Sequence, residues 1–170
     1  MTFIDVTKRD QPRGRPVLDI PTGFVYGAAV PSLWRIGERT MKPELTYLTW
    51  TAAMTALMWI PYVLERMKAW GLSDTVGYPS APKPQSPWAT RMKAAHANAI
   101  ENLAVFAALV LVANAAGISN GTTVFAAALY FWSRVVHLGA YTLALPWIRT
   151  LGFTGGFIAQ MIFAWLLIVR

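Results

Sequence analysis

Hydrophobic residues fill four long windows of the chain, and each window is long enough to cross a lipid bilayer as a helix. The windows cover roughly residues 45–64, 97–116, 122–143 and 151–169. A bilayer core of about 30 Å needs about 20 mostly apolar residues, because an α-helix rises 1.5 Å per residue. The pattern therefore predicts an all-α membrane protein, a four-helix transmembrane bundle whose successive helices run antiparallel.

Two of these segments also carry a row of polar residues. The first row consists of Arg91, Asn98, Glu101 and Asn102, and the second of Tyr130, Arg134, His137 and Tyr141. At about 100° per residue, each row falls on one side of its helix, within about 100° for the first and about 60° for the second. Ionisable groups are costly at membrane depth unless they are paired or solvated. We therefore expect both rows to face inward and to converge on one polar pocket.

Composition supports a membrane protein, because 55% of the residues are hydrophobic, 14% are charged and the mean hydropathy is +0.40. The net charge of +7 raises the question of a nucleic-acid partner. The basic residues gather at the ends of the hydrophobic windows, however, and form no continuous basic face. We expect the partner to be the lipid bilayer and not a nucleic acid.

Charge also predicts the orientation of the bundle. The connection after the first window carries Arg66, Lys68, Lys83, Arg91 and Lys93 against Asp74 alone, and residues 114–123 carry no charge. Positively charged loops stay on the cytoplasmic side. The first loop is therefore predicted to be cytoplasmic, and both termini to lie on the outer side. Four prolines between Pro79 and Pro87 predict that this loop is extended.

Residues 1–40 differ from the rest, so we divide the chain into an irregular N-terminal extension (1–40) and a transmembrane domain (41–170). The extension holds four prolines and six basic residues, and its apolar stretch over residues 23–34 is too short to span a bilayer. Met41 would be an ordinary start for such a domain. The extension is either a disordered tail or an arm that docks on another subunit.

Several kinds of chemistry have no basis in the residues. The chain has no cysteine, so a thiol reaction needs a thiol from the substrate. The two histidines lack metal-ligand spacing, and neither a glycine-rich phosphate loop nor a Ser, His and Asp set occurs. We expect no metal site.

Two motifs carry a resemblance to a known family. The stretch Arg91-Met-Lys-Ala-Ala-His-Ala-Asn-Ala-Ile-Glu-Asn-Leu-Ala-Val-Phe106 resembles the signature of the MAPEG family, the membrane-associated proteins in eicosanoid and glutathione metabolism. The run Arg134-Val-Val-His-Leu-Gly-Ala-Tyr141, followed after a proline by Arg149, is similar to the family's third-helix run. The resemblance covers about residues 42–170, and the chain looks like a bacterial-type member with an N-terminal extension.

The resemblance implies a homotrimer of four-helix subunits that binds glutathione between neighbouring subunits near the cytoplasmic side. It implies glutathione-binding roles for Arg91, Asn98, Glu101, Arg134, His137 and Tyr141. Arginine forks suit the two carboxylates of glutathione, and a glutamate suits its ammonium. By similarity, Arg149 is the catalytic residue that stabilises the thiolate. The implied activity is that of a transferase or peroxidase for lipophilic electrophiles, with Phe153 and Phe157 as apolar walls.

Two departures from the family pattern leave an alternative open. Ala94 stands where the family has a second arginine, and no arginine follows over residues 143–146. The alternative is a non-catalytic accessory subunit of a larger membrane complex, docked through the extension. Single residues also have structural alternatives: Asn98 and Glu101 as a clamp between helices, Arg134 and Glu101 as a buried ion pair, and Gln160 as an interhelical hydrogen bonder.

Overall fold

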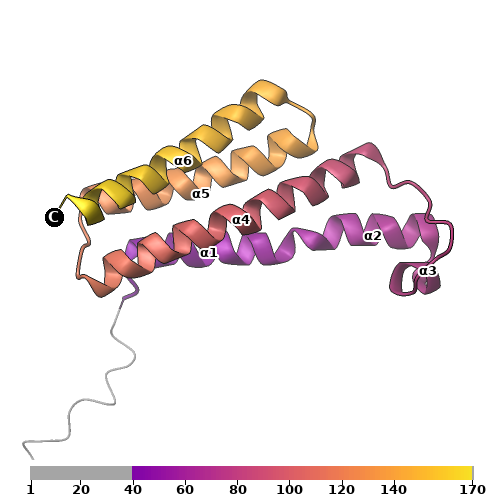
Figure 1. Cartoon of the computed structure of the whole chain (residues 1–170), viewed down its shortest axis with the longest axis horizontal. Helices are drawn as coiled ribbons and strands as arrows, with labels where there is room; N and C mark the ends of the chain where they lie inside the picture. The colour runs from indigo at the N-terminus through magenta and orange to yellow at the C-terminus, as the bar shows by residue number, and fades with distance from the viewer. Residues whose placement is uncertain (1–39, 170) are drawn as a thin grey trace, which may run out of the picture. The chain divides into compact units, whose positions relative to one another are not determined.

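Six helices follow one another in the computed structural model, which describes residues 40–169 (Figure 1). They are α1 (Pro43–Leu57), α2 (Trp59–Trp70), α3 (Leu72–Val76), α4 (Pro87–Ala115), α5 (Gly121–Thr142) and α6 (Pro146–Ile168). This part of the chain contains no strand. The predicted extension over residues 1–40 lies, apart from Thr40, outside the described residues.

The helices form an antiparallel bundle in which α1 and α2 together make the first rod. Figure 1 shows the connection between α2 and α4 at the same end as the α5–α6 turn, while the α4–α5 connection lies at the opposite end. Helices α4 and α6 are both long and apolar enough to cross a membrane. The predicted all-α membrane fold is confirmed.

The first rod is broken at Met58, although the hydrophobic window predicted one helix over residues 45–64. Pro61 explains the break, because a proline has no N–H to donate and its ring collides with the carbonyl group four residues earlier. That carbonyl belongs to Leu57, the last residue of α1. The N–H of Met58 instead bonds to the main-chain oxygen of Thr55 at 3.2 Å, and α2 starts afresh at Trp59.

Helix α4 begins at Pro87, well before the hydrophobic window at residue 97, so its first turns extend past the apolar segment. Proline suits the first helical position because that residue needs no N–H donor. Glu65 of α2 holds this start: its Oε1 accepts from the N–H of Ser86 at 2.9 Å and its Oε2 from Nε2 of Gln85 at 3.2 Å. The C-terminal end of the proline-rich loop is therefore hydrogen-bonded to α2.

A buried carboxylate joins the helices at the opposite end of the bundle. Glu44, in the first turn of α1, accepts hydrogen bonds at Oε1 from Ser119 Oγ (2.9 Å) and Thr123 Oγ1 (2.5 Å). Thr123 also completes the capping box with Asn120 at the start of α5. Between the two ends, the core centres on the rings of Phe106 and Tyr130, stacked 3.7 Å apart.

Candidate functional site

The two polar rows meet inside the bundle at Arg134 of α5, which is only 2% exposed. Its Nη1 donates to Asn98 Oδ1 at 3.2 Å and its Nη2 to Asn102 Oδ1 at 3.4 Å, both on α4. Gln160 of α6 donates from Nε2 to the main-chain oxygen of Asn102 at 3.0 Å. A single hydrogen-bond network therefore links α4, α5 and α6 at membrane depth.

The Arg134 guanidinium is surrounded by neutral groups. Its Cζ lies 5.1 Å from the ring centre of Tyr130 and 5.6 Å from that of Phe153, distances typical of cation–π contacts. Gly156 makes room for it, because a Cβ atom there would come within 2.5 Å of Nη2. Within residues 40–169 no carboxylate forms an ion pair with Arg134, so amide oxygens and aromatic faces alone balance this charge.

An open hollow of about 230 Å³ lies beside the α5–α6 turn, and three polar side chains border it among apolar residues. Its lining consists of Arg91, Ala140, Tyr141, Ala144, Leu145, Pro146 and Arg149. Arg91 is fixed by a bond from its Nε to the main-chain oxygen of Thr142 at 3.0 Å. The Cζ atom of Arg149 lies 5.0 Å from the centre of the Tyr141 ring. The hollow therefore brings two guanidinium groups and a phenol together.

The turn that carries Arg149 has an unusual residue at its centre. Helix α5 closes with a bond from the N–H of Leu145 to the oxygen of Ala140 at 2.8 Å, the pattern of a Schellman motif. Ala144 lies in the left-handed region with φ of 60°, where glycine is usual. Pro146 then starts α6 and sets Arg149 in its first turn.

His137 connects the hollow to the interior. Its Nδ1 lies 3.0 Å from the main-chain oxygen of Arg149, and its ring contacts the Tyr141 ring edge-on with centres 5.5 Å apart. His137 is buried, and its Nε2 has no hydrogen-bond partner among the described residues. It thus lies behind the hollow, between Arg149 and the deeper Arg134 network.

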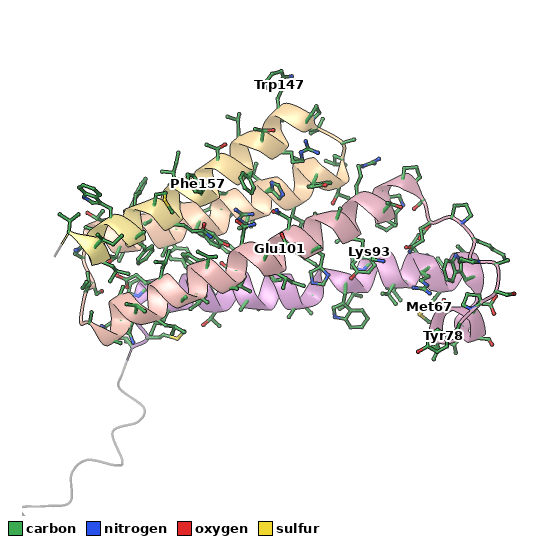
Figure 2. All side chains as sticks on the ribbon, in the orientation of Figure 1. Met67, Tyr78, Lys93, Glu101, Trp147 and Phe157 are labelled. Carbon is green, nitrogen blue, oxygen red and sulfur yellow. The ribbon has the colours of Figure 1, made fainter. Side chains whose placement is uncertain are left out.

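Glu101 is the one residue of the predicted site that belongs neither to the Arg134 network nor to the residues at the hollow. It lies about halfway along α4 with its side chain exposed (Figure 2). Lys93 and Ala94, where the sequence departs from the family pattern, are exposed on the same helix. In the structure, Arg134 is therefore hydrogen-bonded to Asn98, and Arg149, Tyr141 and Arg91 line one hollow. The side chain of Glu101 is exposed on the surface of the chain.

Several contacts were not predicted from the sequence. Asn102 belongs to the polar row but was given no site role, although it binds both Arg134 and Gln160. His96 pairs through Nδ1 with the Tyr62 hydroxyl at 3.0 Å, across α2 and α4. Both predicted apolar walls are exposed in one chain, Phe153 by 40% and Phe157 by 48% (Figure 2), and the Phe153 ring also packs beside His137 with ring centres 6.2 Å apart. The described residues contain no cluster of three metal-ligating side chains.

Comparison with known proteins assigns the chain to a family. No curated protein and no solved structure matches it. A model of the MAPEG family matches residues 45–169, which include nearly all of the first rod and the whole of α4 and α5 and α6. This match covers most of the chain and both polar rows. The chain is therefore an integral membrane protein that belongs to the MAPEG family.

Proposed function

We propose that this protein is a glutathione-dependent membrane transferase or peroxidase that acts on lipophilic electrophiles. The observation that carries the proposal is the hollow at the α5–α6 turn, where Arg91, Tyr141 and Arg149 meet. Guanidinium groups bind carboxylates through paired hydrogen bonds, and glutathione carries two carboxylates. Glutathione would enter as cosubstrate and supply the thiol that the cysteine-free chain lacks.

Arg149 is the catalytic residue in this proposal. A free thiol has a pKa near 8.5 and is mostly protonated at neutral pH. A guanidinium beside the sulfur favours the thiolate, and each unit by which the thiol pKa falls, worth about 1.4 kcal/mol, raises the thiolate fraction up to tenfold. The thiol proton would pass to water, and the thiolate would attack an electrophilic carbon, forming an S–C bond while the leaving group departs with its electron pair. Arg149 acts as a fixed positive charge and takes no proton.

The remaining binding residues lie at two depths. Tyr141 and Arg91 border the hollow with Arg149. Deeper in the bundle, His137 bonds to the main chain of Arg149, and Arg134 bonds to Asn98. The hollow of one chain is smaller than the roughly 300–1,000 Å³ of typical ligand pockets. This size supports a site that a neighbouring subunit completes.

The outward face of α4 supports self-association. One line of exposed residues recurs along α4 at alternating spacings of four and three, and most of its members are small: Thr90, Ala94, Ala97, Glu101, Ala104, Ala108, Leu111 and Ala115. The bulkier Ile100, Val105 and Val112 are exposed beside this line. Small residues at such spacing let membrane helices approach closely. The corresponding face of α6 carries bulky apolar residues such as Ile158, Met161 and Trp165, which suit lipid.

Glu101 gives an independent reason for covering this face of α4. A carboxylate halfway along a membrane helix is costly in hydrocarbon, so its exposure in one chain is best relieved by a second protein surface. We propose a homotrimer packed along α4, with Glu101 brought to the glutathione site between subunits. The basic loop end, which includes the hollow, would face the cytoplasm, and both termini the outer side.

The second candidate is a non-catalytic accessory subunit, with residues 1–40 docking on a larger membrane complex. One observation favours it: the hollow holds only two guanidinium groups, and Arg91 already uses its Nε on Thr142. Ala94 adds no cation to the exposed face of α4. A weaker positive field would hold the anionic tripeptide less firmly.

Titration calorimetry of the detergent-purified protein with glutathione separates the two functions. The enzyme proposal predicts saturable binding at glutathione concentrations up to about 1 mM, the upper end of usual KM values. Glu101→Gln should weaken binding at least about tenfold, because the ammonium loses its charged partner. Asp74→Asn, which changes an exposed acid on α3, is the matched control and should bind normally. Absence of binding at millimolar glutathione, together with residues 1–40 found packed on a different polypeptide, would decide for the accessory subunit.

A further inference from the structure

Two side chains brace the α5–α6 turn, one on each side of it. Arg91 donates to the main-chain oxygen of Thr142, where α5 ends, and His137 bonds to the main-chain oxygen of Arg149, where α6 begins. We propose that His137 is a positioning residue for Arg149: it fixes the first turn of α6 so that the Arg149 guanidinium stays over Tyr141. This inference rests on the proposed function, since it explains how Arg149 is held beside the thiol.

The bond fixes the hydrogen positions on the imidazole. A carbonyl oxygen can only accept, so Nδ1 of His137 carries the hydrogen and donates to Arg149. The other nitrogen, Nε2, is then left buried without a partner among residues 40–169, which costs free energy. A leucine at this position would avoid that cost. The Nδ1 bond to Arg149 is therefore what the structure gains from having a histidine here.

The imidazole of His137 contacts both the backbone of Arg149 and the ring on which the Arg149 guanidinium packs. It bonds to the main chain of Arg149 and its ring packs against Tyr141, the ring over which the guanidinium lies. Arg149 is the fourth residue of α6, and its own N–H bonds to the main-chain oxygen of Leu145 at 2.9 Å, so the histidine bond adds a contact with α5 to this first turn. A tertiary bond to Arg149 at that point limits how far the guanidinium can move away from the hollow.

Helices α5 and α6 pack closely next to the bond between His137 and Arg149. A Cβ atom at Gly152 would lie 2.9 Å from the main-chain nitrogen of His137 and 3.0 Å from its Cα. The two helices therefore touch backbone to backbone one turn after Arg149. At 5% exposure, and flanked by Tyr141 and Phe153, His137 offers little surface to a ligand. The contribution of His137 to the glutathione site would therefore come through the position of Arg149.

The test compares His137→Leu with His137→Asn in the full-length protein, because the asparagine amide can donate from nearly the position of Nδ1. Ultraviolet absorbance of the bound glutathione thiolate, titrated against pH, gives the pKa of the bound thiol, and calorimetry gives affinity. His137→Leu should raise the thiol pKa, with up to tenfold less thiolate at neutral pH for each unit. Affinity should stay within about threefold, a change of less than 1 kcal/mol. His137→Asn should restore the thiol pKa, and Ser133→Ala, on the same face of α5, should leave it unchanged.

Two results would overturn the proposal. One is a more than tenfold loss of affinity in His137→Leu with the thiol pKa unchanged, which would mean that His137 contacts the ligand itself. The other comes from hydrogen exchange without ligand: the amides of residues 149–153 should exchange faster in His137→Leu but not in His137→Asn, and unchanged exchange in His137→Leu contradicts the positioning role. This second readout needs no glutathione, so it decides on His137 even if the wild-type protein fails to bind glutathione and the proposed function falls.

Discussion

Arg134 of α5 and Asn98 of α4 are joined by a hydrogen bond of 3.2 Å in the interior of the bundle. This contact places a buried guanidinium against a neutral amide oxygen. A buried charge with incomplete partners is strongly destabilising, whereas a fully apolar replacement of the whole group is often tolerated. The Arg134 network should therefore be sensitive to single changes and less sensitive to combined ones.

Asn98→Leu should lower the free energy of unfolding by about 1–3 kcal/mol, because Arg134 loses one of its two amide acceptors. Combining it with Arg134→Met should cost less than the sum of the two single changes, since the unpaired charge is then gone. Equilibrium unfolding in mixed detergent micelles measures both. Strictly additive effects would show that Asn98 and Arg134 do not depend on each other.

Glycine substitutions test the close packing of α5 on α6. Gly152→Ala should destabilise the protein most, because its Cβ would meet the backbone of His137, which cannot yield. Gly156→Ala should cost about 1–3 kcal/mol, since it displaces the Arg134 guanidinium from its amide partners. Gly139→Ala is the matched control: its Cβ would meet no atom within 4 Å, so a helical alanine should be neutral or stabilise by up to about 1 kcal/mol. Thermal unfolding gives the order of stability of the three variants. Equal effects at Gly139 and Gly152 would contradict the close packing of α5 on α6.

Ala144→Gly should stabilise the protein by about 0.5 kcal/mol. Removing the left-handed strain of a non-glycine residue gains about 1–2 kcal/mol, and the greater freedom of glycine in the unfolded chain offsets about 0.5–1 kcal/mol of that. Ala140→Gly, in the helix just before the turn, should instead destabilise. Differential scanning calorimetry of the two variants checks the sign, and a lower Tm for Ala144→Gly would show that the turn does not require a positive φ.

Glu65 gives the loop anchor a defined pH dependence. It lies just beyond the predicted first span, and the Ser86 N–H lowers the pKa of its carboxyl below the ordinary value of 4.5. A lowered pKa means that the carboxylate favours the folded loop above pH 4.5, and that this contribution is lost as pH falls through the lower, folded-state pKa. Limited proteolysis of the loop over residues 77–86 should therefore speed up below about pH 4.5. Glu65→Leu should be cleaved quickly at every pH, and a pH-independent rate in the wild type would rule out the anchor.

Sequence reasoning predicted the number and direction of the long rods, because hydrophobic length is a strong constraint in a bilayer. It also predicted that Arg134 and Asn98 lie on inward faces, since helical periodicity alone fixes which residues share a side. It missed the break at Met58, although Pro61 was a visible signal, because the apolar window runs through the proline without interruption. The hydrophobic window began ten residues after the start of α4, because hydropathy marks the membrane and not the helix.

Other features are contacts between residues that lie far apart in the sequence, and no local pattern predicts such contacts. Glu44 bonds to Ser119 and Thr123, more than 70 residues away, and nothing near Glu44 indicates that partner. The pairing of Tyr62 with His96 likewise depends on the register of α2 against α4. Glu101 was expected beside Arg134 because both lie in polar rows. Its exposed position in one chain shows that periodicity gives the face of a helix but not which neighbour covers it.

The most direct test of the proposed enzyme is a difference spectrum at neutral pH. Adding glutathione to the detergent-purified protein should produce the ultraviolet absorbance of a thiolate, because the proposal has Arg149 lower the thiol pKa of the bound tripeptide. Arg149→Ala should abolish that absorbance while much of the affinity remains, whereas Arg66→Ala, which removes a cation packed on Trp70 outside the hollow, should keep it. An unchanged thiolate signal in Arg149→Ala, or none in the wild type when its sites are filled, would contradict the role assigned to Arg149.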